Sequence, residues 1–463
     1  MPPITNYYAS EDGVNLPSST AFFRVTKGVN ILGYFDSPIG HSESCRLITQ
    51  CLKTEGIPVN CVSFPIGHQT RSEKIKQFKR RLKHLNHQIN IFSVNQEDTG
   101  LLIKDCFSMR KILTRYNIIV WFWECDIIPK EFSNCLKYVD EIWVTSQYMY
   151  DVLLKEITAK LETAPKLFYF KHPIEVQPIH QAKLTEKVNK AKPFGLPEKF
   201  TFLFFLNWTV RRKNPLGLLK AFKAAFPNEE NVQLVVKSQN SAAFINSAEF
   251  QELVNEDSRI IWLDGEIGDK RFDLMNACDC YISLHRSEGF GLTMTEAMLL
   301  GKPVIATGYS GNMDFMTEEN SYLCRYKIDP VGAATSPYPE NGHWAEPCTE
   351  HAAQQMRNVY QNYPEACVKA IRGKHDIETH HSYNAIGKIL RKRLNEIYQK
   401  QEDEYPIPSS TAIFRLRYVA MHRLFGPIKQ AIYATYLRMP DPIKSIYRTC
   451  RKHLRKLGKP GIS

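Results

Sequence analysis

The feature that most constrains this chain is a regular alternation of short apolar segments with helical patterns. The first series opens with an apolar run at 29–35, and the helical pattern that follows pairs Leu47 with Cys51 at a spacing of four residues. Further strand-length apolar runs lie at 59–64, 89–94, 118–123 and 141–145. Strands that alternate with helices predict βαβ units and a parallel sheet.

The alternation then begins a second time. An amphipathic helical pattern occupies 216–226, and strand-length runs lie at 200–206, 232–237, 260–263, 280–284 and 303–307. A chain of 463 residues is long enough for two domains. We therefore predict two doubly wound α/β domains, at 28–178 and 193–400. Because such folds bind ligands outside the carboxyl ends of their strands, the cleft between the domains is the expected site.

Composition separates the body of the chain from its C-terminus. Hydrophobic residues make up 43% of the chain and charged residues 23%, which excludes wholesale disorder. The formal net charge is +12, and residues 411–463 alone hold twelve Lys and Arg against one acid, a net charge of +11. The rest of the chain is therefore nearly neutral. An anionic partner would bind the C-terminal tail, which we place at 408–463.

The tail alternates aromatic and aliphatic residues with basic ones, as in Phe414, Arg415, Leu416 and Arg417. Prolines divide it into short helical segments. Basic amphipathic helices with aromatic residues suit an anionic membrane surface. A tail that packs on the body or stays disordered, and a tail that binds nucleic acid, remain open as alternatives.

Other features of the sequence predict a cytoplasmic protein, peripheral at the inner face of the membrane if the tail binds there. The N-terminus lacks a basic start followed by an apolar run, so we expect no secretory signal. No stretch approaches the ~20 apolar residues of a spanning helix. The twelve cysteines include no CxxC pair, which favours reduced core thiols over a metal or disulfide role.

The most informative stretch is 283–298, SLHRSEGFGLTMTEAM. A strand enters a glycine-containing loop, a helix begins near Thr293, and Gly301 ends that helix. Backbone N–H groups at the start of such a helix form an anion site that suits a diphosphate. The residues placed there are Gly289, Phe290, Gly291, Leu292 and Thr293.

Two carboxylates, Glu288 and Glu296, flank this anion site. Carboxylates repel a phosphate, but they accept strong hydrogen bonds from sugar hydroxyls. A sugar attached to a diphosphate therefore fits the loop. The alternative is a solvated helix with two surface glutamates.

The segment SEGFGLTMTEAMLLGKPVIATG resembles the E-x7-E signature of the family-four retaining glycosyltransferases of GT-B fold, with Glu288 and Glu296 at its acidic positions. The resemblance extends from about Val29 to the 390s. It implies two Rossmann-like doubly wound domains facing a central cleft, here followed by the basic helical tail. It also implies that Glu288 holds the donor sugar's hydroxyls and Glu296 the ribose hydroxyls of the nucleotide.

Residues 211–215, RRKNP, resemble the same family's basic motif for the donor diphosphate. Lys213 and a neighbouring guanidinium would neutralise the charge that builds on the departing nucleoside diphosphate, in place of a metal ion. Many members carry an arginine six residues before this lysine, where this chain has Asn207. We expect Arg212 or Arg211 to take its place. An isolated basic turn is otherwise usually solvated.

Weaker matches lie elsewhere in the chain. Gly33 and Gly40 resemble the family's first loop, where a glycine lets the backbone approach the donor phosphate. Asp314 falls in a segment that resembles the loop facing the sugar. The pair Trp123 and Glu124 ends a strand at the cleft, and Glu124 is expected to contact the acceptor or the reacting sugar.

Together these arguments predict a metal-independent, retaining glycosyltransferase that moves a hexose from a GDP- or UDP-sugar to a glycan or lipid-linked acceptor, in cell-surface polysaccharide or glycolipid synthesis. No cofactor and no nucleic-acid partner are expected. The predicted catalytic residues are Glu288, Lys213, Arg212 and Glu124. The predicted donor-binding residues are Gly40, Phe290, Gly291, Leu292, Thr293, Glu296, Asn207 and Lys237. A non-catalytic nucleotide-sugar-binding protein of the same fold, or another GT-B enzyme such as an epimerase, remains the alternative.

Overall fold

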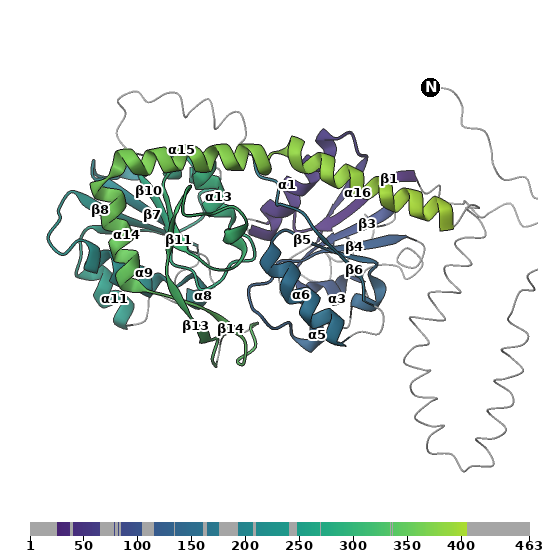
Figure 1. The fold of residues 1–463 in the computed structure, drawn as a ribbon, viewed down its shortest axis with the longest axis horizontal. Coiled ribbons are helices and arrows are strands. Elements are labelled where there is room, and N and C mark those ends of the chain that lie inside the picture. Colours follow the sequence, from purple (N-terminus) through teal and green to yellow (C-terminus); the bar gives the residue numbers. More distant parts are fainter. Residues whose placement is uncertain are drawn as a thin grey trace, which may run out of the picture.

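The computed structural model describes residues 26–37, 40–64, 78, 82, 85–103, 115–133, 135–160, 164–175, 193–206, 210–239, 248–268, 270–333, 335 and 337–404. They form two α/β domains that lie side by side (Figure 1). The predicted tail at 408–463 lies outside the described residues, and so does Asn207. Of the described helices, none is both long and apolar enough to cross a membrane.

The first domain is built on a parallel sheet whose inner strands are largely buried, although they carry polar residues such as Asn30, Asn90 and Asn117. Such strands are typical of a sheet covered by helices on both faces. In spatial order the strands are β2 (Val59–Ser63), β1 (Thr26–Gly33), β3 (His87–Ser93), β4 (Tyr116–Val120), β5 (Glu141–Val144) and β6 (Lys166–Tyr169). The helices that join them include α1 (Gly40–Thr54), α3 (Gln96–Leu101), α5 (Lys130–Ser133) and α6 (Gln147–Lys160).

The second domain repeats this plan with a second parallel sheet. Its strands, in spatial order, are β12 (Tyr322–Cys324), β11 (Val304–Thr307), β10 (Cys280–Ser283), β7 (Phe200–Leu206), β8 (Val232–Ser238) and β9 (Ile260–Leu263). Its helices include α8 (Val210–Lys213), α9 (Pro215–Ala225), α11 (Ala248–Asn255), α12 (Lys270–Ala277), α13 (Leu292–Leu299), α14 (Thr349–Gln361) and α15 (Tyr363–His380).

The strand order reverses once in each sheet, between β1 and β3 in the first and between β7 and β10 in the second. Loops that leave the carboxyl ends of two strands at such a reversal run in opposite directions and open a crevice. The segments that follow β1, β3, β7 and β10 are therefore the ones that the fold offers to a ligand.

A hairpin of the second domain reaches across to the first. It consists of β13 (Tyr326–Pro330) and β14 (His343–Pro347), which pair antiparallel. Tyr338, from the loop that joins the two strands, packs in the apolar cluster of the first domain together with Trp344 of β14. The backbone N–H of His343 donates to Asp126 Oδ1 at 2.7 Å. The hairpin therefore belongs to both domains.

The last described helix, α16 (Tyr383–Glu404), follows the second domain in the chain but packs against α1 of the first, and Figure 1 shows it continuing the line of α15. Arg393 of α16 forms two hydrogen bonds to the carboxylate of Glu141, Nε to Oε1 at 2.8 Å and Nη2 to Oε2 at 2.7 Å. Glu141 is completely buried, and Trp143 and Tyr116 also donate to it. This buried pair fastens α16 to the first sheet.

Most of the predicted strands are confirmed to within one or two residues. The strand predicted at 118–123 ends at Val120: the Trp121 N–H still donates to the Trp143 carbonyl at 3.2 Å, and the next residues, 122–124, line the space between the domains. The sequence analysis missed β6 and β12, which are short, and the β13–β14 hairpin, whose first strand is largely exposed and lacks an apolar run. The predicted arrangement of two Rossmann-like domains is confirmed.

Substitution of Arg393 by Met should destabilise the protein by about 3–5 kcal/mol, because it leaves the buried Glu141 carboxylate without its cation. Urea denaturation followed by tryptophan fluorescence measures the loss. The control is Glu396→Ala, which removes an exposed partner of the same arginine and should change stability by about 0.5 kcal/mol. Equal, small effects of the two substitutions would contradict this account of α16.

Candidate active site

A cavity of about 1550 Å³ lies between the two domains, at the crevices that the strand reversals create. The first domain lines it with the segments after β1, β3 and β4, and the second with the segments after β7, β8 and β10. Of the twelve predicted site residues, eleven line this cavity: Glu288, Lys213, Arg212, Glu124, Gly40, Phe290, Gly291, Leu292, Thr293, Glu296 and Lys237.

The loop from β10 to α13 forms the floor of the cavity. Gly291 has a φ of 110°, a conformation that favours glycine, and its carbonyl accepts hydrogen bonds from the N–H groups of Met294 and Thr295 in the first turn of α13. The N–H groups ahead of these have no acceptor within the helix, as at any helix N-terminus, and the anion site assigned to them stays a prediction. The Thr293 hydroxyl accepts from Tyr281 at 2.7 Å.

A neighbouring loop holds Glu288 in place. The hydroxyl of Ser310 accepts a hydrogen bond from the Glu288 N–H at 2.8 Å, and the Gly311 N–H donates to the Glu288 carbonyl at 3.0 Å. Gly311 has to be a glycine because a Cβ there would overlap the Gly289 carbonyl. The segment after β11 thus supports the backbone of the β10–α13 loop at the bottom of the cavity.

The side chain of Glu288 meets two cations from the segment after β7. Its Oε1 lies 2.6 Å from Lys213 Nζ and 3.1 Å from Arg212 Nη1. The residue is only 7% exposed. Burial alone would raise the pKa of Glu288, but the attraction of the two cations outweighs burial and lowers the pKa to about 2. Glu288 is therefore an ionised hydrogen-bond acceptor.

Arg212 also reaches the first domain. Its Nη2 lies 3.7 Å from Glu124 Oε1, and the Tyr338 hydroxyl donates to Glu124 Oε2 at 2.9 Å. Burial and the neighbouring carboxylates raise the pKa of Tyr338, which keeps it a donor. Both carboxylate oxygens of Glu124, in the first domain, therefore lie next to side chains of the second domain. Three residues that the sequence predicted separately, Glu124, Arg212 and Glu288, are thus brought together.

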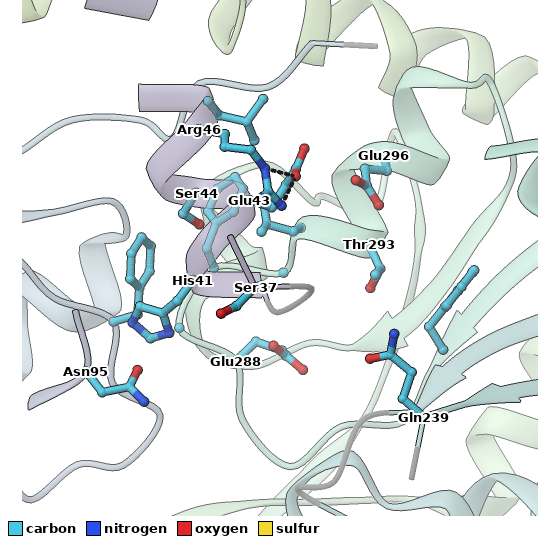
Figure 2. Close-up of a pocket in the computed structure, with 18 of the residues that line it drawn as sticks. Ser37, His41, Glu43, Ser44, Arg46, Asn95, Gln239, Glu288, Thr293 and Glu296 are labelled. Atoms are coloured by element: carbon cyan, nitrogen blue, oxygen red, sulfur yellow. Dashed lines mark hydrogen bonds and ion pairs between the residues drawn. The ribbon is translucent and has the colours of Figure 1, made fainter. Parts of the chain in front are cut away.

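A second charged group lies on the other side of Glu288, and Figure 2 shows Glu296 and Thr293 there, on the helix that follows the loop. Glu296 is 4% exposed, and its Oε1 lies 3.2 Å from Arg271 Nη2. The same guanidinium lies 3.3 Å from Glu43 Oε1, on α1 of the first domain. Burial raises the pKa of Glu296, while Arg271 opposes that shift.

The first-domain wall contributes His41 and Asn95, which Figure 2 places on the side of Glu288 opposite to Thr293. Nε2 of His41 is buried and has no hydrogen-bond partner among the residues that the structure describes. Burial lowers the pKa of His41 to about 4, so the ring is neutral near pH 7. Among the described residues, only Leu292 Cδ1 would lie within 4 Å of a Cβ at Gly40, which lines the cavity.

Two residues that were named from the sequence, Lys237 and Asp314, form hydrogen bonds within the protein. The Lys237 ammonium donates to the carbonyls of Ser238 and Gly265, so it holds the cavity wall together. Asp314 lies outside the cavity lining. It accepts hydrogen bonds from the Gln147 N–H and the Tyr169 hydroxyl and so joins the second domain to the start of α6.

Arg271, Tyr338 and Asn95 are among the cavity residues that the sequence did not indicate. Arg271 and Tyr338 act on carboxylates that are distant in the sequence, so no local spacing connects them. Asn95 directly follows the first-sheet strand at the reversal point. Its position after a predicted strand is the one signal that could have indicated it.

Part of the chain matches a known protein family. Residues 186–334, about a third of the chain, match the family model described as glycosyl transferases group 1. That region contains α8, the β10–α13 loop and both glutamates. No curated protein sequence matches the chain.

Several solved structures share the fold at low sequence identity. Sucrose-phosphate synthase from Thermosynechococcus elongatus is 14% identical, with a TM-score of 0.57 over 81% of this chain and all of that one. HepE from Anabaena, in complex with UDP and glucose, is 13% identical, with a TM-score of 0.56 over 80% of this chain and all of that one. The pneumococcal O-GlcNAc transferase GtfA, in complex with UDP and GlcNAc, is 16% identical, with a TM-score of 0.51 over 70% of this chain and 60% of that one. The fold is therefore that of the GT-B glycosyltransferases.

The low pKa of Glu288 makes its contribution to stability depend on pH. Its pKa is lowered from 4.5 to about 2, so the ionised carboxylate stabilises the folded protein above about pH 4.5. The difference in unfolding free energy between the protein and Glu288→Gln should be constant above that pH and should shrink as the pH falls from about 4.5 toward 2. Urea titrations at a series of pH values measure it.

Glu256→Gln is the matched control, because Glu256 pairs with Lys223 at the exposed surface. Its substitution should give a small difference at every pH. If the difference in unfolding free energy between the protein and Glu288→Gln does not decrease at acidic pH, the carboxylate is not held by the two cations.

Proposed function

We propose that this protein is a retaining glycosyltransferase that moves a hexose from a nucleotide sugar to a hydroxyl of a glycan or lipid-linked acceptor, without a metal ion. The observation that carries the proposal is the buried cluster of Glu288, Lys213 and Arg212 beside the first turn of α13. The cluster places an acceptor of sugar hydrogen bonds directly next to two cations and an anion-binding helix terminus.

Two groups of residues in the cavity orient the donor. The diphosphate lies at the backbone N–H groups of the β10–α13 loop, with Lys213 beside it. Glu296 accepts the ribose hydroxyls, and Glu288 accepts those of the sugar. The UDP in complexes of HepE and GtfA supports a UDP-sugar, and a GDP-sugar is the other candidate.

Transfer takes place on one face of the sugar. The bond between the anomeric carbon and the diphosphate oxygen breaks, the acceptor oxygen bonds to the same face, and a donor phosphate oxygen takes the acceptor's proton. Lys213 and Arg212 stabilise the charge that develops on the leaving group. Glu124, held by Arg212 and Tyr338, accepts a hydrogen bond from the acceptor or the reacting sugar.

A binding protein without catalysis would need the anion site and Glu296, but it would not need a carboxylate with two cations at the point where the bond breaks. The cluster at Glu288 thus favours an enzyme. The product would enter a cell-surface polysaccharide or a glycolipid. The basic tail supports this setting, because it suits a protein that works in the cytoplasm at the inner face of the membrane.

Release of nucleoside diphosphate from a panel of UDP- and GDP-sugars, with EDTA present, tests the activity. We expect one donor to be hydrolysed or transferred, and Glu288→Gln to reduce the rate on the order of 10²–10³-fold, because the substitution removes charge from the site of bond breaking. Glu378→Gln, which changes an exposed acid on α15, is the control and should retain the rate. Release that depends on added metal, or that survives intact in Glu288→Gln, would contradict the mechanism.

Vesicle flotation tests the tail. Vesicles that contain phosphatidylserine should bind the full chain. Deletion of 411–463 should abolish most of this binding, since +11 of the net charge is removed. Replacement of Arg451, Lys452, Arg455 and Lys456 by Gln should weaken binding in the same direction and make it less sensitive to salt. Neutral phosphatidylcholine vesicles are the control. Equal binding of the full and the shortened chain would exclude the tail as the anchor.

A further inference from the structure

Arg271 is the one guanidinium in the described cavity lining that contacts Glu296, and it belongs to α12 rather than to the loops at the strand reversals. Its Nε and Nη2 lie 3.3 and 3.2 Å from Glu296 Oε1. A carboxylate offers about four lone-pair sites to hydrogen-bond donors. The arginine therefore fixes the direction of the carboxylate and leaves capacity for further donors.

Arg271 itself is held on other sides. Its guanidinium carbon lies 4.2 Å from the ring centre of Phe272, and Nη2 lies 3.3 Å from Glu43 Oε1 across the domain boundary. Glu43 in turn pairs with Arg46 at 2.7 Å. A guanidinium held by a ring and an acid has little rotational freedom, so it can hold Glu296 in a fixed direction.

Glu296 needs such a partner because it is buried. A buried carboxylate without a cation tends to take up a proton, and it then accepts hydrogen bonds less well. Burial raises the pKa of Glu296, the nearby Glu43 raises it further, and Arg271 is the group that lowers it. The hydrogen-bonding capacity of Glu296 therefore depends on Arg271.

We propose that Arg271 is a positioning residue for nucleotide recognition: it orients Glu296 toward the ribose and so makes the site select ribonucleotides over 2′-deoxyribonucleotides. This inference rests on the proposed function, in which the cavity binds a nucleotide sugar. Arg271 acts through Glu296, and the part of the donor that the two residues recognise is the ribose. The diphosphate, which lies at the helix terminus and Lys213, is not read by Arg271.

Calorimetric titration of the full chain with UDP, GDP and their 2′-deoxy counterparts tests the proposal. We expect the unaltered protein to bind the preferred ribonucleotide on the order of 10-fold more tightly than its deoxy form, as for loss of a hydrogen bond to a charged group. In Arg271→Gln this ratio should fall toward one, while the affinity for inorganic pyrophosphate stays unchanged. Arg271→Lys, which restores the charge but not the two-nitrogen contact, should recover part of the ratio.

Arg372→Gln is the matched control, because it removes the same charge from the exposed face of α15, where Arg372 donates to a backbone carbonyl. It should leave the ratio intact. If Arg271→Gln keeps the full ratio between the affinities for the ribonucleotide and its deoxy form, the inference is wrong. An equal loss of affinity for nucleotides and pyrophosphate would also overturn it, because Arg271 would then be a phosphate-binding cation.

If the proposed function itself is wrong, the same titrations give a different result. If the unaltered protein binds neither UDP nor GDP, the cavity is not a nucleotide site, and this inference falls with it. If it binds one of them and the ratio is unaffected by both Arg271 substitutions, the inference alone is wrong. Thermal unfolding of each variant identifies any that fail to fold, and the Arg271→Lys ratio then decides the question.

Discussion

The interaction on which the site depends is the buried guanidinium of Arg212. It pairs with Glu288 of its own domain and approaches Glu124 of the other, and its Nη1 also donates to the Ser287 carbonyl at 2.6 Å. A buried cation is tolerated only when acids and carbonyls surround it. Two acids that would repel each other are therefore held at the cavity by one cation, and the two domains have to face each other for all of these contacts to form.

The fold and the main site residues could be predicted because both follow from local patterns. Apolar runs of strand length indicate the parallel sheets, and the reversal of strand order fixes which loops face a ligand. Glu288, Glu296 and Lys213 lie on such loops, so their positions along the chain were enough to bring them to one cavity. The hairpin at 326–347 had no comparable signal, since its first strand is exposed and has no apolar face.

Contacts between distant segments could not be predicted. Nothing near Arg271 in the sequence indicates that it meets Glu43, 228 residues away. Tyr338 lies 214 residues from Glu124. Asp314 lies in a segment that resembles a loop facing the sugar, and no feature of the sequence indicated that it accepts a hydrogen bond from the start of α6. A motif locates a backbone segment, whereas the partner of a side chain depends on how whole domains pack.

The return of α16 to the first domain has a consequence for the order in which the chain folds as it is made. Domains generally fold N-terminal first during synthesis. Here the completed first sheet contains Glu141, whose cation is Arg393, 252 residues later. Until α16 has been translated, Glu141 lacks the guanidinium that pairs with it and has only the Trp143 and Tyr116 donors of its own domain. The first domain therefore completes its packing only after the second domain has been made.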